Sequence, residues 1–286
     1  MTPKRPYRAL FAGILVPGAG HAYAGDRRGA LRGFAVVTAL FVVGALLASP
    51  RIFAFSAHPF AGSSSLLGSV LSFVPLHLWP EVGNLVETAV LWATQPPLTP
   101  EHSRLLRLPL EYEQLGLMLT GMAGALNFFV AADACWLVAR DNLAAERGRT
   151  LAGRPALDAL AAWLVPGLGH WRLGLRPTAA VVGGALAACW LLGLWFSGFA
   201  GCDRAQLYWW WAAQSGLGGL CAVTTPLLGP VAVAADVPTM DLGVTLLSVA
   251  GLLNLAVVTD VYSRSERRAL EAAGIVGAST IEEAGA

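Results

Sequence analysis

Hydrophobic and polar residues are arranged along the chain in long blocks. Four stretches, at about 29–49, 114–139, 177–199 and 241–262, are almost entirely apolar. Each reaches the ~20 residues that an α-helix needs to cross a bilayer. The chain is 56% hydrophobic and only 13% charged, a combination that is unusual in soluble domains. The pattern therefore predicts an all-α polytopic membrane protein in which these stretches are transmembrane helices.

Two short motifs each occur twice. LVPGAGHAYAG at 15–25 and LVPGLGHWRLG at 164–174 share Pro-Gly-x-Gly-His, followed four positions later by glycine. GALNFFVAAD at 124–133 and GLLNLAVVTD at 251–260 share Gly-x-Leu-Asn, with an aspartate six positions after the asparagine. This internal symmetry predicts two tandem units, 1–149 and 150–286, joined by a polar stretch.

The first motif follows a basic segment and contains Ala22-Tyr23-Ala24, which is typical of a secretory signal with its cleavage site. The second copy lies in the interior of the chain, where it cannot be a cleavage signal. We therefore expect the first copy to remain in the mature protein as a structural segment.

The proline and glycines of each motif predict a break in the helix, because proline opposes helix continuation and glycine reaches backbone angles closed to other residues. The turn residues are Pro17, Gly18, Gly20 and Gly25 in the first unit and Pro166, Gly167, Gly169 and Gly174 in the second. A helix over 8–16 extends only ~14 Å, about half of a ~30 Å hydrocarbon core. Each unit is expected to contain a re-entrant half-helix and two transmembrane helices. A kinked helix that crosses completely is the alternative.

The positive residues support the re-entrant topology. The re-entrant topology leaves four of the 19 Lys and Arg residues on the outer side, namely Arg51, Arg104, Arg107 and Arg204. A topology in which the segment crosses the membrane completely doubles that number. Because cytoplasmic flanks collect Lys and Arg, both termini are expected in the cytoplasm. The outer loops, 50–113 and 200–240, are apolar but interrupted by Pro, Gly or charge, which predicts interfacial helices or shallow hairpins, with Trp209, Trp210 and Trp211 in the aromatic belt. A pair of extra transmembrane helices in each loop would leave the number of Lys and Arg on each side unchanged, so that alternative remains open.

Six polar residues lie in or beside the predicted membrane segments: His21, Asn127, Asp133, His170, Asn254 and Asp260. A carboxylate at the bilayer centre costs at least ~2.5 kcal/mol, and depth pairs His21 with Asp133 and His170 with Asp260. The two asparagines lie at the depth of the helix breaks, where they can donate to unpaired carbonyls. We favour a structural role for this cluster over a site for an ion, a proton or a lipid head group.

Other candidate residues carry weaker signals. Arg27, Arg28, Arg172 and Arg176 follow the turns and either contact lipid phosphate or act as topological anchors. Cys202 and Cys221 share an outer loop and either form a disulfide or remain free. The sequence has no CxxC, metal-ligand spacing or cofactor motif, so we predict neither a metal nor a cofactor. A bis-histidine haem on His21 and His170 is the least favoured alternative.

These motifs resemble a bacterial membrane-protein family of unknown function with Pro-Gly-x-Gly-His-x-Tyr-x-Gly near its start and Gly-Leu-Leu-Asn-x5-Asp-Ala near its end. The first unit matches at Pro17, Gly18, Gly20, His21, Tyr23, Gly25, Leu126, Asn127, Asp133 and Ala134. The second keeps Pro166, Gly167, Gly169, His170 and Gly174 but has Arg172 and Val261 in place of the tyrosine and the alanine. The chain is more distantly similar to the two-transmembrane-helix domain family, although one residue is missing between Gly20 and His21. The resemblance implies a bacterial inner-membrane location.

Three classes of function fit these observations. The one we favour is a scaffold or accessory subunit of a membrane complex, with the lipid bilayer and other membrane subunits as partners. The alternative is a small transporter or ion pathway that uses the paired His/Asp sites, because broken helices and buried charge are typical of transporter sites. An intramembrane enzyme is less favoured, since no nucleophile geometry is visible. The net charge of +1 gives no indication of nucleic-acid binding.

Overall fold

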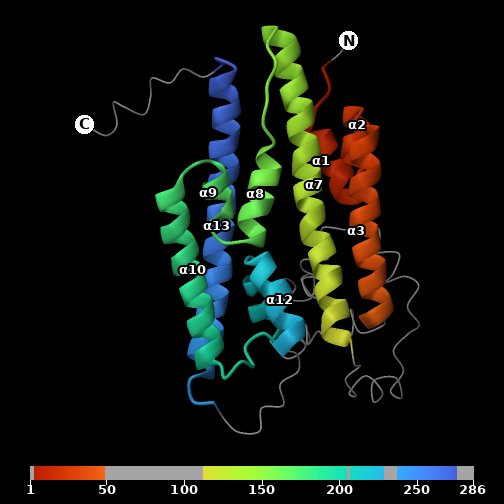
Figure 1. Ribbon diagram of the computed structural model, residues 1–286. Coiled ribbons are helices and arrows are strands. Elements are labelled where there is room, and N and C mark those ends of the chain that lie inside the picture. The colour runs from red at the N-terminus through yellow and green to blue at the C-terminus, as the bar shows by residue number, and fades with distance from the viewer. Residues whose placement is uncertain (1–2, 49–111, 205–206, 229–236, 276–286) are drawn as a thin grey trace, which may run out of the picture.

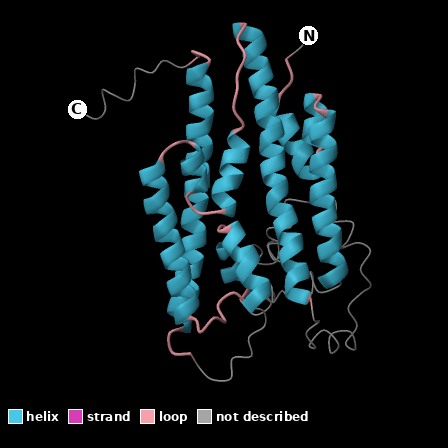
Figure 2. Ribbon diagram, in the orientation of Figure 1, coloured by secondary structure: helices cyan, strands magenta, loops and turns pink. Residues whose placement is uncertain are grey.

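The computed structural model describes residues 3–48, 112–204, 207–228 and 237–275. Within these ranges all regular secondary structure is helical (Figure 2), which confirms the all-α prediction for this part of the chain. The first elements are α1 (Pro6–Leu15), α2 (Ala19–Ala24), α3 (Arg27–Ala48) and α7 (Glu113–Arg147). They are followed by α8 (Pro155–Leu164), α9 (Leu168–Arg172), α10 (Arg176–Phe196), α11 (Tyr208–Gln214), α12 (Gly218–Leu228) and α13 (Met240–Ala272). The interfacial helices expected in the first outer loop fall almost entirely outside the described residues.

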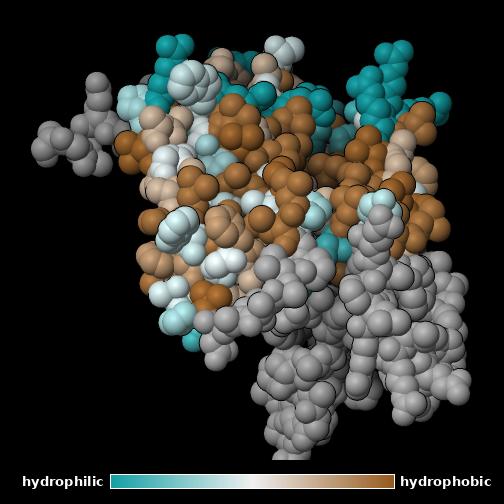
Figure 3. Space-filling model, turned by 60° about the horizontal axis from the view of Figure 1, so that its bottom comes forward, coloured by the Kyte–Doolittle hydropathy of each residue, from teal (hydrophilic) through white to brown (hydrophobic). Residues whose placement is uncertain are grey.

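Four helices, α3, α7, α10 and α13, are long and apolar enough to cross a membrane, and they coincide with the four predicted spans. Helices α7 and α13 continue past the predicted ends to Arg147 and Ala272. The segments after Arg140 and Arg264 are rich in Ala, Glu and Arg, which are strong helix formers, so the helix outlasts the apolar run. Figure 3 shows a broad apolar surface with hydrophilic residues gathered along its upper edge.

The helices form two sets that lie side by side (Figure 1). In the N-terminal set, α1, α2 and α3 pack against α7; in the C-terminal set, α8 and α10 pack against α13, with α9 between them. Contacts of α7 with α8 and α12 join the two sets. Along this boundary the Phe129 and Trp163 rings lie 5.4 Å apart, and Gln114 Nε2 donates to Asp203 Oδ1 at 3.1 Å.

Both prolines of the repeated motif stand where a helix ends. Helix α1 gives way to extended backbone at Val16 (φ −136°, ψ 122°), and α8 does so at Val165 (φ −132°, ψ 116°). The next helices begin after Gly18 and Gly167, whose φ angles are 77° and 82°. A side chain on either glycine would also collide with a carbonyl of the following long helix. Helix α8 accordingly ends part-way along α13 (Figure 1).

The second outer loop contains α11 and α12, and α12 lies directly beneath α8 (Figure 1). The two helices approach so closely that a Cβ at Gly219 would overlap the carbonyl of Leu164. Trp210 is 46% exposed, but Trp211 is only 2% exposed. The Trp211 indole donates to Thr225 Oγ1 at 2.8 Å. The prediction that Trp211 belongs to an aromatic belt is therefore wrong, because this N–H finds its partner inside the bundle.

Candidate functional site

The two asparagines bond to the backbone at the helix breaks. In a continuous helix the carbonyl of Gly13 accepts from residue 17 and that of Ala162 from residue 166, but both of these residues are prolines and have no N–H. Asn127 Nδ2 donates to the Gly13 carbonyl at 2.9 Å, and Asn254 Nδ2 donates to the Ala162 carbonyl at 3.3 Å. Both asparagines are fully buried. Each side chain thus supplies the hydrogen bond that the proline removes.

Asn254 has a second acceptor that the sequence did not indicate. Its Nδ2 also donates to the carbonyl of Gly216 at 2.8 Å, in the turn between α11 and α12. Because α12 begins directly under the end of α8, this one amide group bonds to both sides of the junction. Asn254 therefore holds α8, α12 and α13 together at a single point.

His21 and Asp133 lie in contact, with His21 Nε2 3.1 Å from Asp133 Oδ2. Helix α2 carries the histidine and α7 carries the aspartate, and their side chains are 4% and 5% exposed. The aspartate is an acceptor when ionised, so the imidazole donates from Nε2. The contact fixes α2 against the middle of α7.

Arg154 completes this contact from the C-terminal set, and the sequence analysis did not identify it as a site residue. Its Nε donates to Asp133 Oδ1 at 3.3 Å, and its Nη2 donates to Asp133 Oδ2. The hydrogen bond with Asp133 raises the pKa of Arg154. Arg154 precedes α8, so a buried carboxylate on α7 joins the N-terminal set to the first residues of the C-terminal set.

The corresponding contact in the C-terminal set is built differently. His170 Nε2 lies 3.0 Å from Asp260 Oδ2, but the Asp260 side chain is 42% exposed. Its other partner is Arg264, one turn further along α13, which donates from Nε at 2.7 Å. Asp260 thus pairs within its own set and near solvent, whereas Asp133 is buried and connects the two sets.

Arg172, a candidate for lipid phosphate, is instead engaged within the protein. Its Nε donates to Asp158 Oδ1 at 2.7 Å, and Ser265 Oγ donates to Asp158 Oδ2 at 2.7 Å. Aligned on the motifs, the equivalent N-terminal positions hold Tyr23, Ala9 and Val138, which form an apolar cluster. Three polar residues have therefore replaced three packed ones together, which explains why Arg172 stands where the motif has tyrosine.

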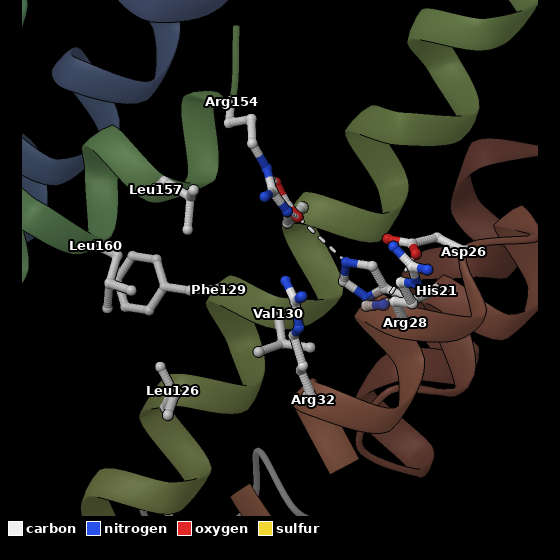
Figure 4. A pocket seen from close by; sticks show the side chains of 13 residues that line it. His21, Asp26, Arg28, Arg32, Leu126, Phe129, Val130, Arg154, Leu157 and Leu160 are labelled. Carbon is white, nitrogen blue, oxygen red and sulfur yellow. Dashed lines mark hydrogen bonds and ion pairs between the residues drawn. The ribbon is translucent and has the colours of Figure 1, made fainter. Parts of the chain in front are cut away.

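A pocket of about 380 Å³ opens beside Asp133, between α2, α3, α7 and α8 (Figure 4). Its polar wall consists of His21, Asp26, Arg28, Arg32, Asp133 and Arg154. Its apolar wall consists of Leu126, Phe129, Val130, Leu157 and Leu160. The pocket therefore joins a charged region to an apolar one, and it brings together residues of both helix sets. Arg28, predicted as a phosphate contact, lies in it, whereas Arg27 does not.

The remaining candidates have simple environments. Arg176 lies over the ring of Trp171, 5.4 Å from its centroid. Cys202 and Cys221 are both free in the structure, and they do not form the disulfide that was one of the two alternatives. Each sulfur instead lies 3.6 Å from a threonine hydroxyl, and burial raises the pKa of the Cys202 thiol to about 11. Among the described residues no group of His, Cys, Asp and Glu is arranged to hold a metal ion.

Comparison with known proteins adds a family but no activity. No curated protein and no solved structure matches the chain. The model of DUF6677, a family of unknown function, matches residues 8–144 and again residues 157–272. Each matched region contains one Pro-Gly-x-Gly-His segment and one Asn-x5-Asp segment, so the family resemblance inferred from these motifs is confirmed. The chain therefore belongs to the DUF6677 family.

Proposed function

We propose that this protein is a scaffold or accessory subunit of a complex in the bacterial inner membrane, built from two tandem units, 1–149 and 150–286. The observation that carries the proposal is that the paired polar residues bond to the protein itself. Both asparagines donate to carbonyls at helix breaks, and both aspartates contact a histidine and an arginine. These bonds fix broken helices in place, which is a structural use of the motifs that accounts for their presence without a reaction.

We further propose that α1 and α8 are re-entrant half-helices that enter from the cytoplasmic side. Each has 10 residues, which corresponds to about 15 Å, or half of the hydrocarbon core. The chain then turns at the proline and glycines, and the asparagine supplies the donor that lipid cannot. The arginines that flank α3 and α10 favour a cytoplasmic location for both termini and for the pocket.

Cysteine labelling tests this topology. In a chain whose four native cysteines have been replaced, we expect D26C and L175C to react with a membrane-impermeant maleimide in inverted vesicles but not in intact spheroplasts. Both positions directly precede a predicted transmembrane helix on the cytoplasmic side. Pro238, which is exposed and lies before α13, provides the control: P238C should react only from the opposite side. Labelling of residues 26 and 175 from different sides would contradict the re-entrant topology.

Purification tests the subunit proposal. We expect the protein, extracted from its own membrane in a mild detergent, to retain one or more other membrane proteins in fixed stoichiometry. An unaccompanied protein in every mild detergent would contradict this expectation. The alternative, a transport pathway, is favoured by the pocket beside Asp133 and by the broken helices. As the second arm of this test we expect liposomes containing the protein to show no proton flux above empty liposomes; a flux that disappears in D133N/D260N would favour transport.

A further inference from the structure

Two arginines of the pocket have no partner in the described part of the chain. Arg28 and Arg32 line it from α3, one helical turn apart, so they lie on the same face of that helix. Both side chains are exposed, and neither makes a hydrogen bond or an ion pair with a described residue. Arg32 lies five residues into an apolar helix, about 7.5 Å from its start. A charged guanidinium within an apolar helix is costly unless it is paired, so we expect an anion to bind at this position.

The carboxylates of the pocket are already engaged. Asp26 Oδ1 accepts from the backbone N–H of Gly29 at 2.9 Å, where it caps the start of α3. Asp133 accepts from His21 and from Arg154. Arg154 enters from the opposite wall and is half exposed, so it presents part of its guanidinium to the pocket. Figure 4 shows Arg154 descending into the pocket from one side, with Arg28 and Arg32 on the other.

The fold itself does not require the arginine pair. Aligned on the motifs, the positions of Arg28 and Arg32 correspond to Pro177 and Val181 in α10. The C-terminal set thus forms the same helix arrangement with no charge at these two positions. Topological anchoring does not explain Arg32 either, because Arg27 and Arg28 already mark the start of the helix. The arginine pair is a property of this pocket.

The apolar wall indicates what accompanies the anion. Across from Arg28 and Arg32 the pocket is lined by Leu126, Phe129 and Leu160 (Figure 4), and α3 carries exposed large apolar side chains next to it, Leu31 and Phe34 among them. A small hydrated anion would leave this wall facing water, whereas an amphiphile would place its charged group at the arginines and its chains along the leucines. Arginine forks match phosphate oxygens in bidentate geometry.

We propose that this pocket binds the phosphate group of an anionic membrane lipid, with Arg28, Arg32 and Arg154 as its ligands and its acyl chains along the apolar wall. That the lipid comes from the cytoplasmic leaflet rests on the topology proposed above. That the pocket binds the lipid does not depend on this topology. Because Arg154 also bonds to Asp133 and precedes α8, the lipid contacts both helix sets at their shared ion pair.

Native mass spectrometry of the purified protein in detergent tests this proposal. We expect phosphatidic acid to bind in a one-to-one complex, and R28Q/R32Q to weaken that binding by about tenfold or more, because two charge-assisted contacts are lost. The matched control is R27Q/R147Q, which removes two exposed arginines that do not line the pocket and should bind as the wild type does. Equal affinity of R28Q/R32Q and the control variant would overturn the proposal.

Two further arms identify the ligand. Glycerol 3-phosphate has the charged group without the chains, and diacylglycerol has the chains without the charge; we expect both to bind at least about tenfold more weakly than phosphatidic acid. Glycerol 3-phosphate that binds as tightly as the lipid would mean a soluble phosphate ligand and overturn the lipid assignment. If R28Q/R32Q does not fold, R28K/R32K serves instead. It retains charge but lacks the fork, so it should bind more weakly than the wild type, and unchanged binding would count against the site.

These measurements need neither a partner protein nor a membrane orientation. A failure to bind lipid therefore leaves the subunit proposal intact, and an absence of co-purifying proteins leaves the lipid proposal intact.

Discussion

Replacing Asn254 with leucine is expected to lower the free energy of unfolding by about 2–6 kcal/mol. The change keeps the branched shape and the number of heavy atoms of the side chain but leaves the carbonyls of Ala162 and Gly216 without their donor, and each buried unsatisfied group costs about 1–3 kcal/mol. N127L should cost about 1–3 kcal/mol, since Asn127 donates to the Gly13 carbonyl. Steric trapping in bicelles measures these energies directly.

Asn142 provides the matched control for this result. It lies on α7 like Asn127 and also donates from Nδ2 to a backbone carbonyl of the N-terminal segment, that of Lys4 at 2.6 Å, but this bond is exposed. Water replaces the lost donor there, so N142L should change stability by less than about 0.5 kcal/mol. If N254L were as mild as N142L, water would have to reach the junction of α8 and α12, and the bonding of the helix break would need another explanation.

Most of the hydrogen bonding at the helix breaks can be predicted from the sequence. Proline lacks an N–H, so the carbonyl four residues earlier loses its partner, and that rule names Gly13 and Ala162 without any coordinates. Asn127 and Asn254 stand at a matching depth on the following long helices. What the sequence could not supply is the second acceptor of Asn254, because Gly216 comes close only through the packing of α12 under α8.

Arg154 was missed for a related reason. It stands in a polar stretch between the two repeated segments, where an arginine is typical of a cytoplasmic flank, and nothing in its sequence neighbourhood points to α7. The signal that was available is the asymmetry of the two copies: Arg264 follows Asp260 by one turn, but the residue one turn after Asp133 is Leu137. A buried aspartate without a local arginine needs one from elsewhere.

Arg172 shows the same limit from the other side. In the sequence, Arg172 is a single departure from the motif with no visible partner. It was therefore a candidate for a contact with lipid phosphate. The structure shows that Arg172 and Ser265 both donate to Asp158, although the three residues lie in different helices. Comparing the two copies at all positions that meet around each break, rather than at the motif alone, would have found this substitution.

The same asymmetry predicts that the two aspartates differ in their importance for stability. D133N should lower the free energy of unfolding by about 1.5–3 kcal/mol, because the buried carboxylate loses its charge-assisted hydrogen bonds with His21 and Arg154. D260N should lower it by at most about 1 kcal/mol, as is usual for an exposed pair. Their side-chain exposures, 5% and 42%, make each the control for the other at equivalent positions of the motif. Unfolding in the same bicelles measures both.

A double-mutant cycle assigns the difference to its cause. Suppose that D133N destabilises the protein because it breaks the bond between the two helix sets. In an R154Q background that bond is already absent, so D133N should then lower the free energy of unfolding only about as much as D260N does. Independent effects of the two substitutions would mean that His21 alone determines the importance of Asp133. The energy would then lie within the N-terminal set, and the ion pair between the sets would contribute little. Because the lipid proposed for the pocket contacts the same arginine, added phosphatidic acid should stabilise the wild type more than R154Q.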